Sequence, residues 1–176
     1  MFVVYLLSIT LLMSCSNNVI SNTGYDIIVA PPDVREQAVW YAKKYIEAGA
    51  QYGWGGQDPL PKLLIDCSGL VIRCYEYATN DLGYSLLFDD TTSSGLKRYT
   101  KELSLDELCS GDILFMGEDD IISHVALFVK IENDKIVFID STYKPEEGIN
   151  GVSERSYLKT DPRFISFGRM LIGKRK

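Results

Sequence analysis

The sequence has few of the residues from which metal sites are built. Among its 176 residues the only histidine is His124, and its four cysteines include no C-x-x-C pair. Zinc sites of familiar spacing need several histidine or cysteine ligands close together. We therefore expect no metal site in this chain.

Positive charge is also scarce. The chain has 18 Lys and Arg residues against 24 Asp and Glu residues, a net charge of −6. Binding to nucleic acid usually requires a basic patch, so the balance argues against a nucleic-acid partner. The hydrophobic fraction of 46% and the charged fraction of 24% are ordinary for a globular protein, and the length suits one domain with a real core.

No charged side chain occurs in residues 1–14, whose apolar run is typical of a signal peptide and short for a membrane span. Leu12-Met13-Ser14-Cys15 is similar to a lipobox, at which bacteria acylate the cysteine and cleave the chain before it. This similarity implies a membrane anchor through lipid on Cys15; the alternative is an ordinary secretory signal with an incidental cysteine. Residues 15–32, which end in Pro31-Pro32, are predicted to be a tether.

The folded domain is predicted to span residues 33–176, with helices first and strands later. A helical stripe starts near Asp33, a candidate N-cap, and ends at Gly49; a second helix opens at Cys67. Later come runs rich in β-branched and aromatic residues, at 112–116, 121–131, 135–142 and 164–172. This order predicts an α+β fold with an antiparallel sheet.

Cys67 occupies an unusual position. It follows a glycine-rich loop, Tyr52-Gly-Trp-Gly-Gly, and stands in Asp-Cys-Ser-Gly at the first turn of the second helix. There the helix dipole lowers a thiol pKa, and unpaired N–H groups can bind an oxyanion. A nucleophilic Cys67 would have only His124 as an imidazole partner, whereas the alternative is a buried core thiol and a structural histidine. Cys74 and Cys109 are interpreted as small core residues, and a disulfide between them stays open.

The strands 121–131 and 135–142 are predicted to form a hairpin. His124, Ala126 and Phe128 share one face of the first strand. A three-residue loop, 132–134, would place Ala126 opposite Asp140 and His124 on the diagonal, at ~7–8 Å. A shift of one residue would turn Asp140 to the other face.

Four sequence motifs follow one another along the chain: Tyr-x-Trp-Gly-Gly, Asp-Cys-Ser-Gly-Leu-Val, Gly-Asp-Ile-Leu-Phe and Ser-His-Val-Ala-Leu-Phe-Val. From about Val34 to the end the chain resembles the NlpC-type cysteine peptidases of bacterial cell walls. The resemblance implies a papain-like fold, with the nucleophile at a helix N-terminus packed on an antiparallel sheet.

The resemblance also implies catalytic roles. Cys67 matches the nucleophile, His124 the general base, and Tyr52 the tyrosine whose hydroxyl helps to bind the oxyanion. Asp140 falls at the position of the third, polar member, commonly a histidine in the family; alternatively, a strand-end aspartate caps the following turn.

Further positions are candidates for substrate binding. Asp66 and Ser68 flank the nucleophile, where the family binds the free amino end of short wall peptides. Asp90 and Thr91 match part of another family patch, and residues 89–95 form a polar run that is a solvated loop, a helix cap or a substrate-facing wall. The remaining candidates are Ser123 and Trp54, and Trp54 is interpreted mainly as a packing residue of the glycine loop.

The implied reaction is hydrolysis in the stem peptide of peptidoglycan, between γ-linked D-glutamate and the following diamino acid. It needs no metal or organic cofactor. We expect a monomer on the outer side of a bacterial membrane, with wall peptide as its partner. The alternatives are a thiol-dependent amidase or acyltransferase, and a catalytically silent wall-binding lipoprotein on the same fold.

Overall fold

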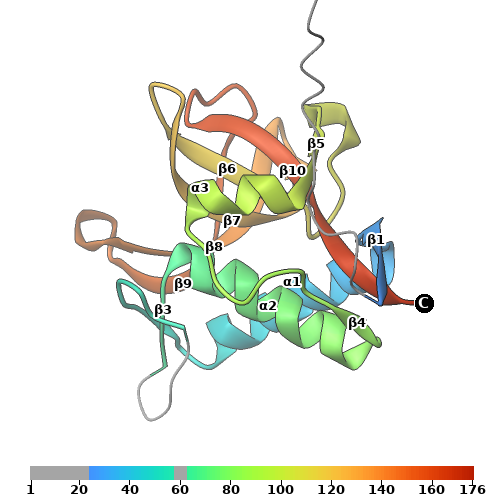
Figure 1. Cartoon of the computed structure of the whole chain (residues 1–176). Helices are drawn as coiled ribbons and strands as arrows, with labels where there is room; N and C mark the ends of the chain where they lie inside the picture. The colour runs from blue at the N-terminus through green and yellow to red at the C-terminus, as the bar shows by residue number, and fades with distance from the viewer. Residues whose placement is uncertain (1–23, 58–62) are drawn as a thin grey trace, which may run out of the picture.

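Two helices pack side by side against a curled sheet (Figure 1). The structure, a computed structural model, describes residues 24–57 and 63–176. The helices are α1 (Pro32–Glu47) and α2 (Cys67–Asp81). Among the described residues, no helix combines the length and the apolar character needed to cross a membrane. The helices and the antiparallel sheet confirm the predicted α+β class. The predicted signal peptide and Cys15 lie outside the described residues.

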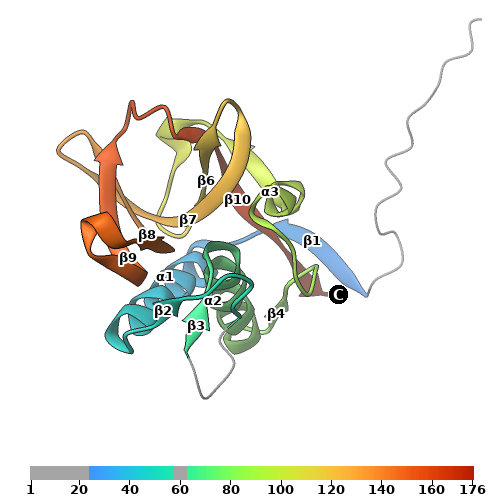
Figure 2. The same cartoon turned by 90° about the vertical axis from the view of Figure 1, so that its left-hand side faces the viewer.

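The main sheet is built from antiparallel pairs in the order β1-β10-β6-β7-β8-β9 (Figure 2). Short strands β4 and β5 also pair with β10, and β2 and β3 form a small parallel pair. The strands are β1 (Tyr25–Val29), β2 (Gln51–Tyr52), β3 (Leu64–Ile65), β4 (Tyr84–Ser85), β5 (Thr100–Leu103), β6 (Ile113–Glu118), β7 (Ile121–Glu132), β8 (Lys135–Lys144), β9 (Ile149–Leu158) and β10 (Phe164–Arg175). The remaining elements are the helix α3 (Ser93–Leu96) and the 3-10 turns η1 (Lys97–Tyr99), η2 (Leu105–Glu107) and η3 (Pro145–Glu147). The four predicted strands are present as β6, β7, β8 and β10, whereas β1 to β5 and β9 were not predicted.

Both faces of the sheet are buried. Along β7, Val125 and Leu127 pack in the larger core beneath α1 and α2, whereas Ala126 and Phe128 pack in a second core on the concave side of the sheet. This alternation follows from the two-residue period of a strand. The predicted division of β7 into two faces is confirmed.

The folded domain begins earlier than predicted. Strand β1 pairs with the end of β10, from Tyr25 opposite Arg175 to Val29 opposite Leu171. The predicted tether, 15–32, is therefore wrong for the part from Tyr25 onward. Pairing with the last strand is a long-range contact that local sequence does not reveal.

Helix α1 also starts differently from the prediction. Pro32 holds the first helical position, where the missing N–H of proline is harmless, and Pro31 is the N-cap. Asp33 lies inside the first turn and accepts from the Val34 N–H, so its predicted role as N-cap is wrong. Gly49, with φ of +68°, ends the helix as predicted.

The hairpin between β7 and β8 reaches the predicted register by another route. Glu132 pairs with Lys135 across a two-residue turn, Asn133-Asp134, with φ of 51° and 58°. The predicted three-residue loop is therefore wrong. A bulge between Phe128 and Lys130 then shifts the pairing by one residue, so that Leu127 lies opposite Ile139. Continuing this register sets Ala126 opposite Asp140, as predicted.

The two cysteines of the predicted core differ from each other. Cys74 is buried on α2, whereas Cys109 is exposed, and no disulfide joins them. The core interpretation is confirmed for Cys74 and wrong for Cys109.

Candidate active site

The N-terminus of α2 is tied to the glycine loop by one carboxylate. Asp66 is the N-cap: its Oδ1 accepts from the Gly69 N–H at 2.7 Å and from the Ser68 hydroxyl at 3.0 Å. Its Oδ2 accepts from the Gly55 N–H at 3.0 Å. Cys67 is thereby fixed at the first helical position, as the sequence predicts.

The first turn of α2 retains donors for a ligand. The Gly69 N–H is used by the Asp66 side chain and the Leu70 N–H by the Asp66 carbonyl. Within the described part of the chain, the N–H groups of Cys67 and Ser68 donate to no acceptor. Such groups, at the positive end of the helix dipole, can stabilise an oxyanion that forms next to the sulfur.

Gly69 permits a close approach between the helix and the glycine loop. A Cβ at this position would lie 2.4 Å from the Gly56 carbonyl oxygen. Gly69→Ala is therefore expected to push the loop away and to lower the free energy of unfolding by about 1–3 kcal/mol. The peptide hydrolysis that the sequence resemblance implies should fall about 10–100-fold in rate. Urea unfolding and a kinetic assay check this.

The matched control is Gly24→Ala, because a Cβ at Gly24 meets nothing within 4 Å. It should leave both quantities unchanged. A Gly69→Ala protein that retains full activity and stability would show that the contact between loop and helix does not matter.

The sulfur of Cys67 is nearly enclosed and hydrogen-bonded. Its residue is 9% exposed, and Sγ lies 3.3 Å from the Ser93 hydroxyl of α3. Burial opposes the thiolate, but hydrogen bonds with His124, Ser93 and the Val125 backbone, together with the His124 charge, lower the pKa of Cys67. The net direction is the one predicted for a nucleophile.

His124 links the thiol to Asp140. Its Nε2 lies 2.6 Å from Asp140 Oδ2, so Nδ1 is the ring nitrogen left for Cys67. Burial disfavours the charged imidazole, but hydrogen bonds with Asp140 and Cys67 outweigh it and raise the pKa of His124 to about 9. The three groups therefore favour a thiolate beside an imidazolium.

Asp140 has a second partner that sequence reasoning missed. It is fully buried, and the Arg155 guanidinium binds both of its oxygens, through Nε at 2.9 Å and through Nη2. Burial opposes the carboxylate, but His124 and Arg155 lower its pKa. Asp140 is thus held between two cationic groups rather than capping a turn. Arg155 lies on β9, which has no clear strand pattern in the sequence.

A hollow of about 380 Å³ opens beside the sulfur. This hollow, named here the Cys67 hollow, is lined by Cys67 and Tyr52. Every predicted substrate-binding residue also lines it: Trp54, Asp66, Ser68, Asp90, Thr91 and Ser123. Trp54 is 91% exposed, so the interpretation of this side chain as a packing residue is wrong, and its indole is free to contact a ligand. Burial and the nearby Cys67 and Asp66 raise the pKa of Tyr52, which keeps its hydroxyl protonated as a donor.

The polar run at residues 89–95 is both a cap and a wall. Thr92 caps α3 by accepting from the Gly95 N–H at 3.1 Å. The neighbouring Asp90, Thr91, Ser93 and Ser94 line the hollow. The sequence left these two roles as alternatives, and the structure combines them.

The residues 49–161 match the profile of the NlpC/P60 family, which is more than half of the chain. This chain belongs to the NlpC/P60 family. No curated protein matches it.

Solved structures show the same fold. A Staphylococcus aureus protein described as similar to a lipoprotein of the NLP/P60 family has 23% identity and a TM-score of 0.55, covering 81% of this chain and 43% of its own. A Bacillus cereus NlpC/P60 family protein has 17% identity and a TM-score of 0.54, covering 84% of this chain and 42% of its own. This chain therefore spans less than half the length of those two proteins.

A third structure covers a single domain. The NlpC/p60 domain of the peptidoglycan hydrolase SagA has 25% identity and a TM-score of 0.50, covering 77% of this chain and 97% of its own. The matched part of this chain thus corresponds to nearly the whole of that domain.

Proposed function

We propose that this NlpC/P60 protein is a cysteine peptidase that hydrolyses the stem peptide of peptidoglycan. The observation that carries the proposal is the chain of contacts from the Cys67 thiol through the His124 ring to the buried Asp140 carboxylate. Such a series is what a nucleophile, a general base and an orienting acid require. The SagA domain, described as part of a peptidoglycan hydrolase, supports the choice of substrate.

The first half of the reaction forms an acyl-enzyme. The Cys67 thiolate attacks the scissile carbonyl carbon, and the carbonyl electrons move to the oxygen. The Cys67 and Ser68 N–H groups and the Tyr52 hydroxyl bind that oxyanion. As the tetrahedral intermediate collapses, the carbon–nitrogen bond breaks and the His124 imidazolium gives its proton to the leaving amine.

The second half releases the acyl group. Neutral His124 takes a proton from water while the water oxygen attacks the thioester carbon. Collapse of this intermediate breaks the carbon–sulfur bond and regenerates the thiolate beside the imidazolium. Asp140, held by Arg155, orients the ring and stabilises its charge throughout.

The proposed scissile bond joins γ-linked D-glutamate to the diamino acid that follows. On the acyl side, Asp66 and Asp90 line the Cys67 hollow and offer carboxylates to the free amino end of a short wall peptide. Ser68, Ser123, Thr91 and Trp54 complete this side. We further propose that lipid on Cys15 holds the protein in the cell envelope.

Digestion of purified peptidoglycan by the full chain, followed by mass spectrometry, tests the proposal. We expect new amino ends on the diamino acid and new carboxyl ends on D-glutamate. Turnover of an acyl ester without release of wall peptides would favour an amidase or acyltransferase instead. Binding to the wall without any turnover would indicate a binding module.

A further inference from the structure

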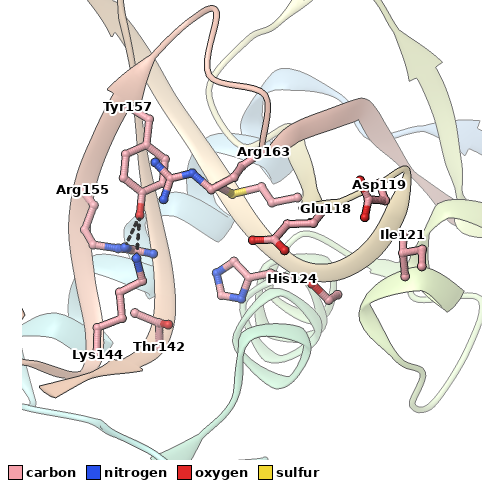
Figure 3. Close-up of a pocket in the computed structure, with 12 residues that line it drawn as sticks. Glu118, Asp119, Ile121, His124, Thr142, Lys144, Arg155, Tyr157 and Arg163 are labelled. Atoms are coloured by element: carbon pink, nitrogen blue, oxygen red, sulfur yellow. Dashed lines mark hydrogen bonds between the residues drawn. The ribbon is translucent and has the colours of Figure 1, made fainter. Parts of the chain in front are cut away.

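His124 lies between two separate hollows. The hollow described above is lined by Cys67 but not by His124. A second hollow of about 550 Å³, drawn in Figure 3, is lined by His124 but not by Cys67. Ser123 lines both. In the proposed reaction the acyl carbon bonds to the sulfur and the leaving nitrogen receives its proton from the imidazole. The second hollow, named here the His124 hollow, therefore lies on the side of the leaving fragment.

One wall of the His124 hollow is cationic and is organised around Tyr157. The Tyr157 hydroxyl oxygen accepts from Arg155 Nη1 at 2.6 Å and from Lys144 Nζ at 3.3 Å. The Arg163 guanidinium stacks over the ring at 3.6 Å from its centre. All four side chains face the hollow in Figure 3.

Lys144 and Tyr157 each keep one donor for a ligand. Arg155 binds Asp140 and Tyr157, and Arg163 is paired with Asp161 through Nε and Nη2. Lys144 has three N–H donors, of which Glu147 and Tyr157 take two. The Tyr157 oxygen accepts two hydrogen bonds, and among the described residues its own hydrogen is donated to no acceptor. An ammonium and a hydroxyl whose nitrogen and oxygen lie 3.3 Å apart are well placed for one carboxylate.

The opposite wall is acidic. Glu118 and Asp119, at the turn between β6 and β7, are exposed and line the hollow across from Lys144, with His124 between the walls (Figure 3). Within residues 24–57 and 63–176, neither carboxylate forms an ion pair. Such a wall repels a polyanion and attracts an ammonium group.

We propose that the His124 hollow binds the zwitterionic leaving fragment, a diamino acid or a dipeptide that begins with one. Its carboxylate binds Lys144 Nζ and the Tyr157 hydroxyl, and its side-chain ammonium lies toward Glu118. The new α-amine then lies beside His124, where it receives the proton. This inference rests on the proposed function and adds a requirement to it: the peptide carries a free carboxylate soon after the scissile bond.

Hydrolysis of two matched tripeptides tests the inference. With L-Ala-γ-D-Glu-L-Lys and its C-terminal amide, we expect kcat/KM to be roughly 10-fold or more higher for the free acid, because a charge-assisted hydrogen bond is lost in the amide. Lys144→Met should remove most of this preference by raising KM for the acid, with kcat little changed. Lys130→Met is the matched control, since Lys130 pairs with Glu132 and does not line the hollow.

A binding experiment that needs no turnover separates this inference from the proposed function. Full-length Cys67→Ala is titrated calorimetrically with L-Lys-D-Ala and with its amide. We expect the free acid to bind. Its affinity should fall roughly 10-fold or more on amidation, in Lys144→Met and in Glu118→Gln. Equal binding of acid and amide, or no binding of either, overturns the inference.

Failure of this inference and failure of the proposed function give different experimental results. Hydrolysis of wall peptides without preference for the free carboxylate overturns this inference and leaves the proposed function intact. Specific binding of L-Lys-D-Ala in the absence of any wall-peptide hydrolysis supports the hollow and contradicts the peptidase.

Discussion

Replacing Cys67 with alanine is expected to lower the rate of wall-peptide hydrolysis by at least about 10⁴-fold, because the nucleophile of a covalent mechanism has no substitute. Cys67→Ser is expected to be nearly as inactive, since a serine hydroxyl in the same place is ionised far less readily than a thiol whose pKa is lowered. Release of peptide ends from purified peptidoglycan, measured by mass spectrometry, checks both variants.

Cys109→Ala is the matched control because Cys109 is exposed and lies outside both hollows. It should retain wild-type activity. Thermal unfolding of Cys67→Ala should show an intact fold, since small changes of one buried side chain usually alter stability by only ~1 kcal/mol. A folded Cys67→Ala protein that still cleaves wall peptides would contradict a covalent mechanism through this thiol.

Replacing Asp140 with asparagine is expected to have two separate effects. Hydrolysis should fall by ~10²–10⁴-fold in kcat, because an amide neither stabilises the His124 charge nor selects the correct ring orientation. The free energy of unfolding should fall by up to about 3–5 kcal/mol, because Arg155, whose side chain is only 9% exposed, loses its carboxylate. Steady-state kinetics and urea unfolding measure the two effects.

The chain offers a matched control for the second effect. Asp112 is another fully buried carboxylate, and Arg169 binds both of its oxygens, at 2.8 and 2.7 Å. Asp112→Asn should lower stability similarly and leave kcat nearly unchanged. The double variant Asp140→Asn/Arg155→Met should regain stability, since no buried charge is left unpaired, without regaining activity. Recovery of activity in this double variant would exclude Asp140 from the catalytic machinery.

The start of α2 could be predicted from the sequence because its signals are local. Asp-Cys-Ser-Gly spans four residues and predicts Cys67 at the first turn, and the structure adds that Asp66 is the N-cap. The helical and strand periods in the sequence were also sufficient to predict the α+β class and which residues of β7 share a face.

The hairpin shows where such reasoning is limited. Asn133-Asp134 is a turn that adopts positive φ at both residues, which fixes a two-residue loop. That loop alone would have displaced Asp140 by one residue, and only the bulge at Phe128 to Lys130 restores it. The predicted register was right because two departures from the simple hairpin cancel.

Arg155 and β9 could not be predicted for a different reason. Exposed polar residues alternate with partly buried ones along most of β9, as at Glu154, Arg155 and Ser156, so that its hydrophobic pattern is weak. The position of this strand depends on its pairing with β8, where Asp140 lies opposite Ser153. The contact between Arg155 and Asp140 is therefore a consequence of tertiary structure rather than of a local motif.

The most direct test of the central claim is the pH dependence of the rate at which iodoacetamide modifies Cys67. The pKa of Cys67 is lowered and that of His124 is raised to about 9. At pH values between the two pKa values, we expect a thiolate beside an imidazolium. Modification should then be fast well below pH 8, much faster than for the exposed Cys109, and His124→Gln should shift the profile to that of an ordinary thiol. Equally slow modification of Cys67 and Cys109 at neutral pH, unchanged in His124→Gln, would contradict the account.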